Sequence, residues 1–203
     1  MPTEHVDQDL DAFADPGDTY VDCRLDGIDA GEVDLRGSRF EGCAFSACTL
    51  RLASLLDVQF NDCTFVACDL MGVDLTRARW PQFALAEAIR FVECRLDYAN
   101  LHGLALEGAV FYGCSMIEAD LGEAVLREAD LRFSDLTGAR FTAADLSQAD
   151  LTGALGYAIH PEHTRLAQTV VSLPEAAVVL QEMGMVVSGP GPRLTAAERL
   201  RES

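Results

Sequence analysis

The stretch "EADLGEAVLREADLRFSDLTGARFTAADLSQADLTGA", residues 118–154, carries the pattern that decides the fold. A large apolar residue stands at every fifth position from Leu121 to Leu151, and a small residue stands two positions before it. This spacing fits neither an α-helix, with 3.6 residues per turn, nor a single strand, with a period of two. It fits a chain that turns a corner every five residues and points one large and one small side chain inward on each side.

The same period continues back to Leu25, and Ala30 is the only small residue at a large position. The small positions hold mostly Ala, Cys, Ser and Val, and they include all seven cysteines of the chain. The close pairs Cys43/Cys48 and Cys63/Cys68 have four intervening residues, but the His pattern that would complete a zinc site is missing. An odd number of cysteines in a chain with no secretion signal fits a disulfide framework poorly. We therefore interpret the cysteines as small, weakly polar core residues.

The period is interrupted at residues 81–90, "PQFALAEAIR", after which it resumes one residue out of register. Pro81 lacks a backbone donor, and Phe83 and Ile89 are large for the small inward position. We interpret the break as a one-residue bulge or kink between two parts of the solenoid. Two explanations stay open: a protruding contact loop, or a tolerated insertion.

The approximate motif A-(D/N)-L-x-x resembles that of the pentapeptide-repeat family over residues 23–155. The resemblance implies an all-β fold, a right-handed quadrilateral parallel β-helix with four five-residue sides to each coil. Coils stacked at the strand spacing of about 4.8 Å would give a rod roughly 31 Å tall over these residues. The four sides that the resemblance implies would also place residues 20 apart in one column, with a ladder of Cys23, Cys43 and Cys63 and an aromatic ladder of Phe40, Phe60 and Trp80.

The two ends of the chain differ from the solenoid. Residues 1–22 carry acidic side chains and no arginine, so we expect an acidic, disordered N-terminal arm with a partial cap. Residues 156–188 are predicted to form a capping and dimerisation module. It would hold a helix over 173–183, with Ser172 and Glu175 as a capping box, and a short strand over 185–187. Residues 189–203 are predicted to be a flexible tail.

The apolar residues of this module favour an end-to-end homodimer about a two-fold axis over a monomeric cap. The expected interface residues are Leu173, Val178, Val179, Leu180, Met183, Met185 and Val187.

No set of residues suggests catalysis. The four histidines are scattered, and the inward cysteines lack electropositive surroundings. The repeated Asp suggests solvation or turn hydrogen bonds rather than an acid–base pair. We predict a protein that is not an enzyme and uses neither cofactor nor metal. No secretory signal or apolar span is found, which favours a cytoplasmic protein that does not enter a membrane.

The net charge of −18, with 33 acidic and 15 basic residues, would repel nucleic acid directly. Several features resemble the topoisomerase-protecting subgroup of the family, which includes Qnr-like, mycobacterial fluoroquinolone-resistance and albicidin-immunity proteins. They are coils that start near residue 23, the Cys-rich first half, the break at "RARWPQFALAEAIRFVECRL" and the C-terminal helix. The resemblance implies a DNA mimic that binds DNA gyrase, with topoisomerase IV as a second candidate, and relieves a poison. A β-helical scaffold with another partner, or a protein that sequesters a drug, are the alternatives.

When the coils are counted across the break, the outward charges lie on several faces of the solenoid and not on one. The candidate contacts are the acids of the two most acidic faces. One would hold Asp69, Glu93, Asp130 and Asp150, and the next Asp57, Asp74, Asp97, Glu118 and Asp135. Leu52 and Leu56 are apolar at positions where the repeat expects polar residues. They would form either a partner site or a patch covered by the N-terminal arm.

Overall fold

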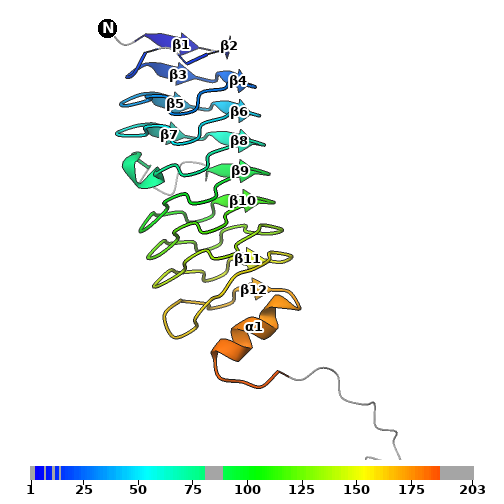
Figure 1. Cartoon of the computed structure of the whole chain (residues 1–203). Coiled ribbons are helices and arrows are strands. Elements are labelled where there is room, and N and C mark those ends of the chain that lie inside the picture. The colour runs from blue at the N-terminus through cyan, green and yellow to red at the C-terminus, as the bar shows by residue number, and fades with distance from the viewer. Residues whose placement is uncertain (1–2, 7, 11, 14, 81–88, 188–203) are drawn as a thin grey trace, which may run out of the picture.

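The computed structural model describes residues 3–6, 8–10, 12–13, 15–80 and 89–187. Short strands stack in layers along a rod, and one helix, α1 (Glu175–Glu182), lies at the C-terminal end (Figure 1). One sheet runs β1 (Glu4–Val6), β3 (Thr19–Val21), β5 (Arg39–Glu41), β7 (Gln59–Asn61). A second runs β2 (Asp9–Leu10), β4 (Arg24–Asp26), β6 (Ala44–Ser46), β8 (Thr64–Val66), β9 (Arg90–Val92), β10 (Val110–Tyr112). The strands β11 (Asp150–Leu151) and β12 (Val170–Val171) form a third pair, and η1 (Leu75–Arg77) is a 3₁₀ turn.

Every strand pair is parallel, and the regular register is 20 residues, as in Arg39 to Gln59 and Ala44 to Thr64. Two further columns of parallel bridges complete the coil, one through Asp69 and one through Asp74. The sides therefore follow one another as the β7 side, the β8 side, the Asp69 side and the Asp74 side. This arrangement makes the fold an all-β, four-sided repeat solenoid.

The inward side chains form a core that runs the length of the solenoid. One aromatic stack joins Tyr20, Phe40, Phe60 and Trp80, with centroid distances of 4.7, 5.4 and 5.9 Å. A second joins Phe45, Phe65, Phe91 and Phe111 at 4.3, 5.0 and 5.4 Å. The predicted ladder of Phe40, Phe60 and Trp80 is confirmed, and Tyr20 extends it.

The seven cysteines are free and buried, as predicted for core residues. Their thiols donate to backbone carbonyls inside the coil; Cys43, for example, donates to Tyr20 O at 3.4 Å. Burial raises the pKa of the Cys114 thiol to about 12, so this group is not a thiolate at neutral pH.

The recurring Asp of the repeat holds the corners. In Asp69, Asp74, Asp120, Asp130, Asp135, Asp145 and Asp150, Oδ1 accepts the backbone N–H two residues later, at 2.8–3.1 Å. This contact is an Asx turn, in which a carboxylate replaces a backbone carbonyl. Of the two roles expected for the repeated Asp, solvation and turn hydrogen bonding, the structure shows the turn hydrogen bonds.

The break is larger than the sequence period indicated. Thr64 pairs with Arg90, 26 residues later, whereas the neighbouring coils differ by 20. The insertion is therefore six residues, and the prediction of a one-residue bulge was wrong. An insertion of five residues leaves a five-residue period unchanged. An insertion of six residues therefore looks, in the sequence, like a slip of one residue. Phe83 and Leu85, which the pattern assigned to inward positions, lie outside the described residues.

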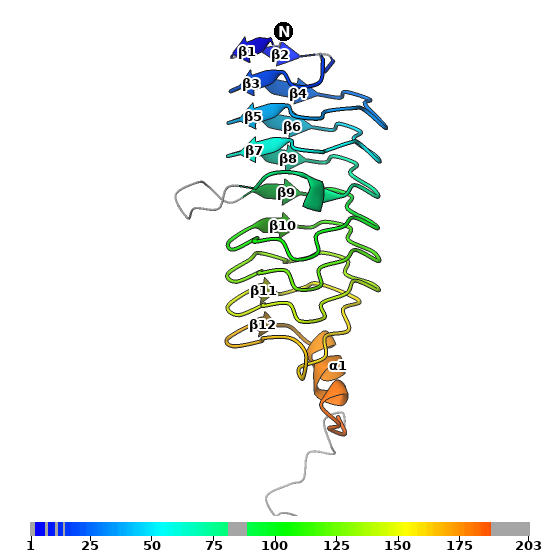
Figure 2. The same cartoon turned by 90° about the vertical axis from the view of Figure 1, so that its left-hand side faces the viewer.

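The N-terminal residues also differ from the prediction. Strands β1 and β2 pair in parallel with β3 and β4, with Glu4 opposite Thr19 and Asp9 opposite Arg24. Figure 2 shows them as the first layer of the stack. The expectation of a disordered arm was wrong for these residues, because Asp18, 2 % exposed, accepts the Thr3 N–H at 2.7 Å and contacts His5. The part of the prediction that assigned a cap to this end agrees with the structure.

The C-terminal helix forms within the predicted range, but its start differs from the predicted capping box. Ser172 Oγ accepts the N–H of Gly153 at 2.9 Å, and Pro174 is the N-cap residue. The Gly153 amide, at the corner after β11, thus takes the hydroxyl that the helix would have used. Residues 185–187 are not a strand; the strand of this module is β12.

Truncation of a residue in the second aromatic stack tests the core. Phe65 is 1 % exposed and contacts Phe45, Phe60 and Phe91. We expect Phe65→Ala to lower the free energy of unfolding by about 3–5 kcal/mol, because it leaves a cavity between coils. Val66→Ala on the same strand, where Val66 is 37 % exposed, should change it by less than about 0.5 kcal/mol. Urea unfolding measures both values, and equal losses would contradict the role of the stack.

The corner carboxylates predict a loss of stability in acid. The Arg132 side chain holds the pKa of Asp130 below its usual range, and the Ser147 hydroxyl does the same for the pKa of Asp145. A carboxyl with a lowered folded pKa stabilises the fold above the unfolded value of about 3.9, and this contribution disappears as pH falls through the folded pKa. We expect the urea midpoint to hold between pH 7 and about 5 and to fall below about pH 4.

The double variant Asp130→Asn, Asp145→Asn is the matched control. An Asn oxygen can still accept the turn hydrogen bond, but it does not titrate. Its urea midpoint should fall less between pH 5 and pH 3 than that of the unchanged protein. An identical fall in both proteins would show that these two carboxyls do not contribute.

Candidate partner-binding surface

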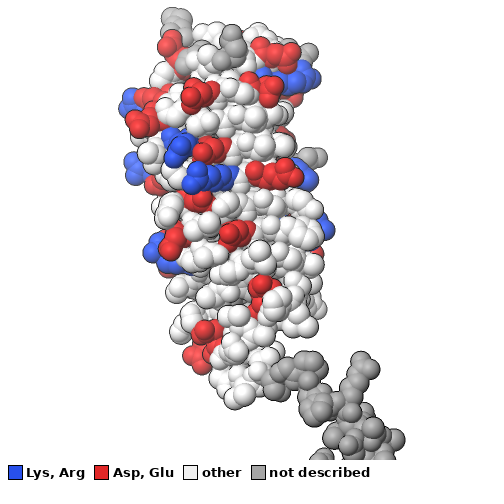
Figure 3. All heavy atoms as spheres, turned by 45° about the vertical axis from the view of Figure 1, so that its right-hand side comes forward, with Lys and Arg blue, Asp and Glu red and all other residues white. Residues whose placement is uncertain are grey.

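Arginines and carboxylates are interleaved on the surface of the solenoid. Guanidinium nitrogens lie 2.7 Å from carboxylate oxygens in the pairs Arg95–Asp97, Arg132–Asp130 and Arg140–Asp120. In the view of Figure 3, red and blue side chains alternate on the upper and middle coils and become sparse towards the C-terminal end. These arginines neutralise only the carboxylates that they contact. The protein as a whole has 33 acidic and 15 basic residues and therefore keeps a large excess of negative charge.

Asp97 is the most buried of the candidate acids. Its side chain is 7 % exposed and accepts hydrogen bonds from Ser115 Oγ, the Ile117 N–H and Arg95 Nε. Burial by itself would raise the pKa of this carboxyl, but the hydrogen bonds from Ser115, Arg95 and Ile117 outweigh it and hold the pKa below its usual range. Asp97 therefore ties neighbouring coils together and offers little surface to a partner.

The other candidate acids differ in how much of the carboxylate is free. Four are paired with arginine: Asp57 with Arg79, Asp69 with Arg51 and Arg95, and Asp130 and Asp150 with Arg132. Asp74 and Asp135 bind the hydroxyls of Thr76 and Thr137 in their own turns. Glu93 and Glu118 are exposed residues at corners with positive φ, and the Glu118 carboxylate lies over Gly138 of the next coil.

The predicted grouping of these acids by face is not found. Asp135 lies in the bridge column of Asp69, through Arg95 and Ser115, and not in the column of Asp74. Asp130 and Asp150 lie on the β8 side, in the column of Val110. The sequence count treated residues 81–90 as an additional side, whereas Phe91 stacks on Phe65. All positions after the break are therefore rotated by one side relative to the prediction.

Three large apolar side chains stand exposed at corners: Leu52 is 56 % exposed, Tyr98 61 % and Phe133 55 %. The repeat pattern predicts exposed apolar side chains at Leu52 and Leu56, whereas Tyr98 and Phe133 were not predicted. Tyr98 and Phe133 could have been found in the sequence, because each is a bulky residue at the positive-φ corner position, which elsewhere holds mostly Gly, Asp, Glu, Ala or Gln. The exposure of Leu52 contradicts the alternative in which the N-terminal residues cover it.

The helix α1 buries none of its residues completely. Of the predicted interface residues, Val179 packs partly against the core, while Leu173, Val178, Leu180, Met183, Met185 and Val187 are exposed. Leu155, Val170, Val171 and Val186 are also exposed near this end and were not predicted. His160 Nδ1 lies 3.0 Å from Glu182 and joins the helix to the last coils.

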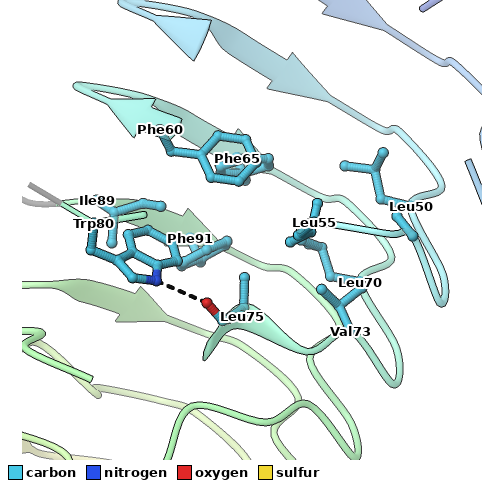
Figure 4. Close-up of a pocket in the computed structure, with 11 residues that line it drawn as sticks. Leu50, Leu55, Phe60, Phe65, Leu70, Val73, Leu75, Trp80, Ile89 and Phe91 are labelled. Carbon is cyan, nitrogen blue, oxygen red and sulfur yellow. Dashed lines mark hydrogen bonds between the residues drawn. The ribbon is translucent and has the colours of Figure 1, made fainter. Parts of the chain in front are cut away.

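The core contains a small apolar cavity near the insertion (Figure 4). It measures about 10 Å³, and Phe65, Leu75, Trp80, Ile89 and Phe91 are among the residues that line it. Trp80 Nε1 donates to Leu75 O at 2.8 Å and fixes the indole at its edge. The space is about that of one water molecule, too small for an organic ligand.

Within the described ranges, no group of three or more His, Cys, Asp or Glu side chains could hold a metal ion. His160 and His163, the one histidine pair of the sequence with short spacing, are not part of such a group. No helix among the described residues is both long and apolar enough to cross a membrane.

Among solved structures, two trypsin-treated variants of QnrB1, a plasmid-mediated fluoroquinolone resistance protein, match this fold. Their TM-scores are 0.54 and 0.55 at 20% and 19% sequence identity. The matches cover 93% and 92% of this chain and 100% and 98% of those chains. HetL, a pentapeptide repeat protein involved in heterocyst differentiation regulation from Nostoc sp. strain PCC 7120, matches with a TM-score of only 0.35 at 20% identity, over 84% of each chain. No curated protein matches the chain.

Two family models match the sequence. The model of pentapeptide repeats in eight copies matches residues 89–127 and 114–153, and the model in nine copies matches residues 30–69. The matched segments end and resume on either side of the insertion, and together they span half of the chain. With the 20-residue parallel register and the stacked inward side chains, these matches show that the chain belongs to the pentapeptide repeat family.

Proposed function

We propose that this protein binds DNA gyrase as a non-enzymatic mimic of duplex DNA and protects it from a topoisomerase poison such as a quinolone or an albicidin-like compound. Topoisomerase IV is a second candidate target. The observation that carries the proposal is the combination of a rigid solenoid with a net charge of −18. Such a surface attracts the basic channel of a DNA-binding protein and repels nucleic acid itself.

The arrangement of charge supports this function. The paired arginines hold carboxylates in fixed positions, as in Arg95 with Asp69 and Asp97 and Arg132 with Asp130 and Asp150. A mimic of DNA needs negative charge at fixed spacing, and the stacking distance of about 4.8 Å per coil repeats it along the rod. Of the candidate contacts, we favour Glu93, Glu118, Asp135 and Asp150 over the buried Asp97.

The protein is proposed to act as a homodimer in the cytoplasm, where gyrase works. The exposed apolar residues of the C-terminal module support this assembly, since Leu173 is 80 % exposed, Met183 53 % and Val186 96 %. An apolar surface of this kind is more often an interface than free surface. Joining two copies at this end would double the length of the acidic rod.

The similarity to QnrB1, described as a plasmid-mediated fluoroquinolone resistance protein, is consistent with this target and shows the fold alone. A scaffold with another protein partner is the alternative. The core cavity of about 10 Å³ cannot enclose a drug, so sequestration would have to use an open surface hollow, such as the one of about 540 Å³ lined by Asp29, Thr49 and Leu52.

The test is gyrase supercoiling in the presence and absence of a poison, with increasing amounts of this protein. We expect supercoiling to recover in the poisoned reaction at low micromolar dimer, because the mimic competes for the DNA channel in which the poison acts. The recovery should weaken as NaCl rises from 50 to 300 mM, since the contact is electrostatic.

If this protein does not restore supercoiling by poisoned gyrase from any of several hosts, the proposal is wrong. Saturable binding of the drug without gyrase would favour sequestration instead.

The dimer can be tested separately by light scattering coupled to size exclusion. We expect Leu180→Asp, in α1, to shift the protein from dimer to monomer, because a carboxylate in an apolar interface must be desolvated without a partner. Leu56→Asp is the matched control, since Leu56 and Leu180 are both 39 % exposed. A monomer for the unchanged protein, or a dimer for Leu180→Asp, would contradict the proposed interface.

A further inference from the structure

The corners of the coil impose a left-handed backbone, which restricts the residues that fit there. Most described corner residues with positive φ are Gly or are small or polar. Leu52, Tyr98 and Phe133 are the large apolar exceptions among them, with φ of 55°, 59° and 61°. The left-handed region is disfavoured for bulky L-residues, so each of these three carries a local conformational cost.

The fold does not recover this cost through burial. Leu52, Tyr98 and Phe133 are all more than half exposed. Residues that are unfavourable for the backbone and do not fill the core are candidates for a role outside the fold.

The neighbouring coil is shaped to hold two of these side chains against the surface. A Cβ at Gly72 would lie 2.7 Å from Leu52 Cδ2, and a Cβ at Gly153 would lie 2.6 Å from Phe133 Cδ1. Each glycine leaves the space in which the apolar side chain of the preceding coil lies. Phe133 also packs edge-on against Tyr112 at 5.4 Å, and Arg132 lies over the Tyr112 ring. These contacts pre-order the side chains before any partner binds.

All three residues border the Asp69 side. The Leu52 N–H donates to Met71 O, and the Gly72 N–H to Asp97 O. These bonds place Leu52, Gly72 and Tyr98 in one corner column, at the end of this side. Phe133 stands at the corner where the chain enters the same side. Successive members are two coils apart, which places them at intervals of about 10 Å along the rod.

The surroundings of these three side chains are acidic. Glu32 and Glu118 share the corner column of Leu52 and Tyr98, Glu93 shares that of Phe133, and Asp135 lies between the two columns. The arginines of this side, Arg51 and Arg95, pair with Asp69. The side thus presents apolar side chains within a negative field.

We propose that the Asp69 side is the docking face, and that Leu52, Tyr98 and Phe133 are its apolar anchors. Its occupant is a protein surface that is basic and has shallow apolar pockets about 10 Å apart. The inference rests on the proposed function, whose partner is basic where it binds DNA. Negative charge would guide the encounter, whereas the anchors would supply the specificity that a purely electrostatic mimic lacks.

The experiment replaces each anchor by asparagine, which tolerates the left-handed backbone better than a bulky apolar residue. Binding of the full-length variants Leu52→Asn, Tyr98→Asn and Phe133→Asn to the gyrase holoenzyme is measured by surface plasmon resonance. We expect each to weaken binding at least about fivefold and the triple variant about a hundredfold. The midpoint of urea unfolding should stay unchanged or rise.

The matched controls are Ala143→Asn and Glu128→Asn. Both positions have positive φ, of 61° and 58°, at corners that do not border the Asp69 side. These variants should bind gyrase as the unchanged protein does, which would separate the face from a general effect of corner substitution.

Each other outcome overturns a different statement. Full binding by the triple variant would remove the docking face and leave the gyrase proposal intact. A lower unfolding midpoint for the anchor variants than for the controls would assign the three residues to the fold. No binding of gyrase by the unchanged protein would overturn the proposed function and, with it, this partner.

Discussion

The parallel hydrogen bonding between successive coils is the constraint on which the rest of the structure depends. Bonds such as Leu50 N–H to Asp69 O and Leu70 N–H to Arg95 O place each residue next to its counterpart one coil later. Each inward side chain must therefore stack on a side chain of similar size, as Phe45 does on Phe65 and Phe65 on Phe91. The core becomes a set of columns with only nearest-neighbour contacts, which is typical of repeat proteins.

This constraint leaves the outward positions open to other roles. Asx turns at residues such as Asp130 satisfy backbone donors at the corners, and arginines such as Arg132 hold the carboxylates in place. A rigid frame with an independent surface suits a protein that acts by shape and charge. The apolar corners on the Asp69 side are the clearest departure from this polar surface.

The columns were predictable because stacking makes the sequence periodic. The five-residue spacing identified the inward positions and the buried cysteines, and the four-sided coil implied by the family resemblance added the ladder of Phe40, Phe60 and Trp80. It could not place the surface residues after the break, because a period of five cannot distinguish an insertion of six residues from a slip of one. For this reason Asp135 was predicted on the face of Asp74, whereas in the structure it lies in the column of Asp69.

The repeat, its inward and outward positions and the acidic character of the chain can all be read from the sequence, because each is a local or periodic property. Which outward residues share a face, how the ends are capped and which carboxylates are free depend on the folded coils. Ser172 binds the amide of Gly153 rather than capping its own helix, and Asp97 accepts hydrogen bonds from Ser115 and Ile117 of the next coil. These outcomes depend on contacts between residues about 20 positions apart, which no local pattern in the chain records.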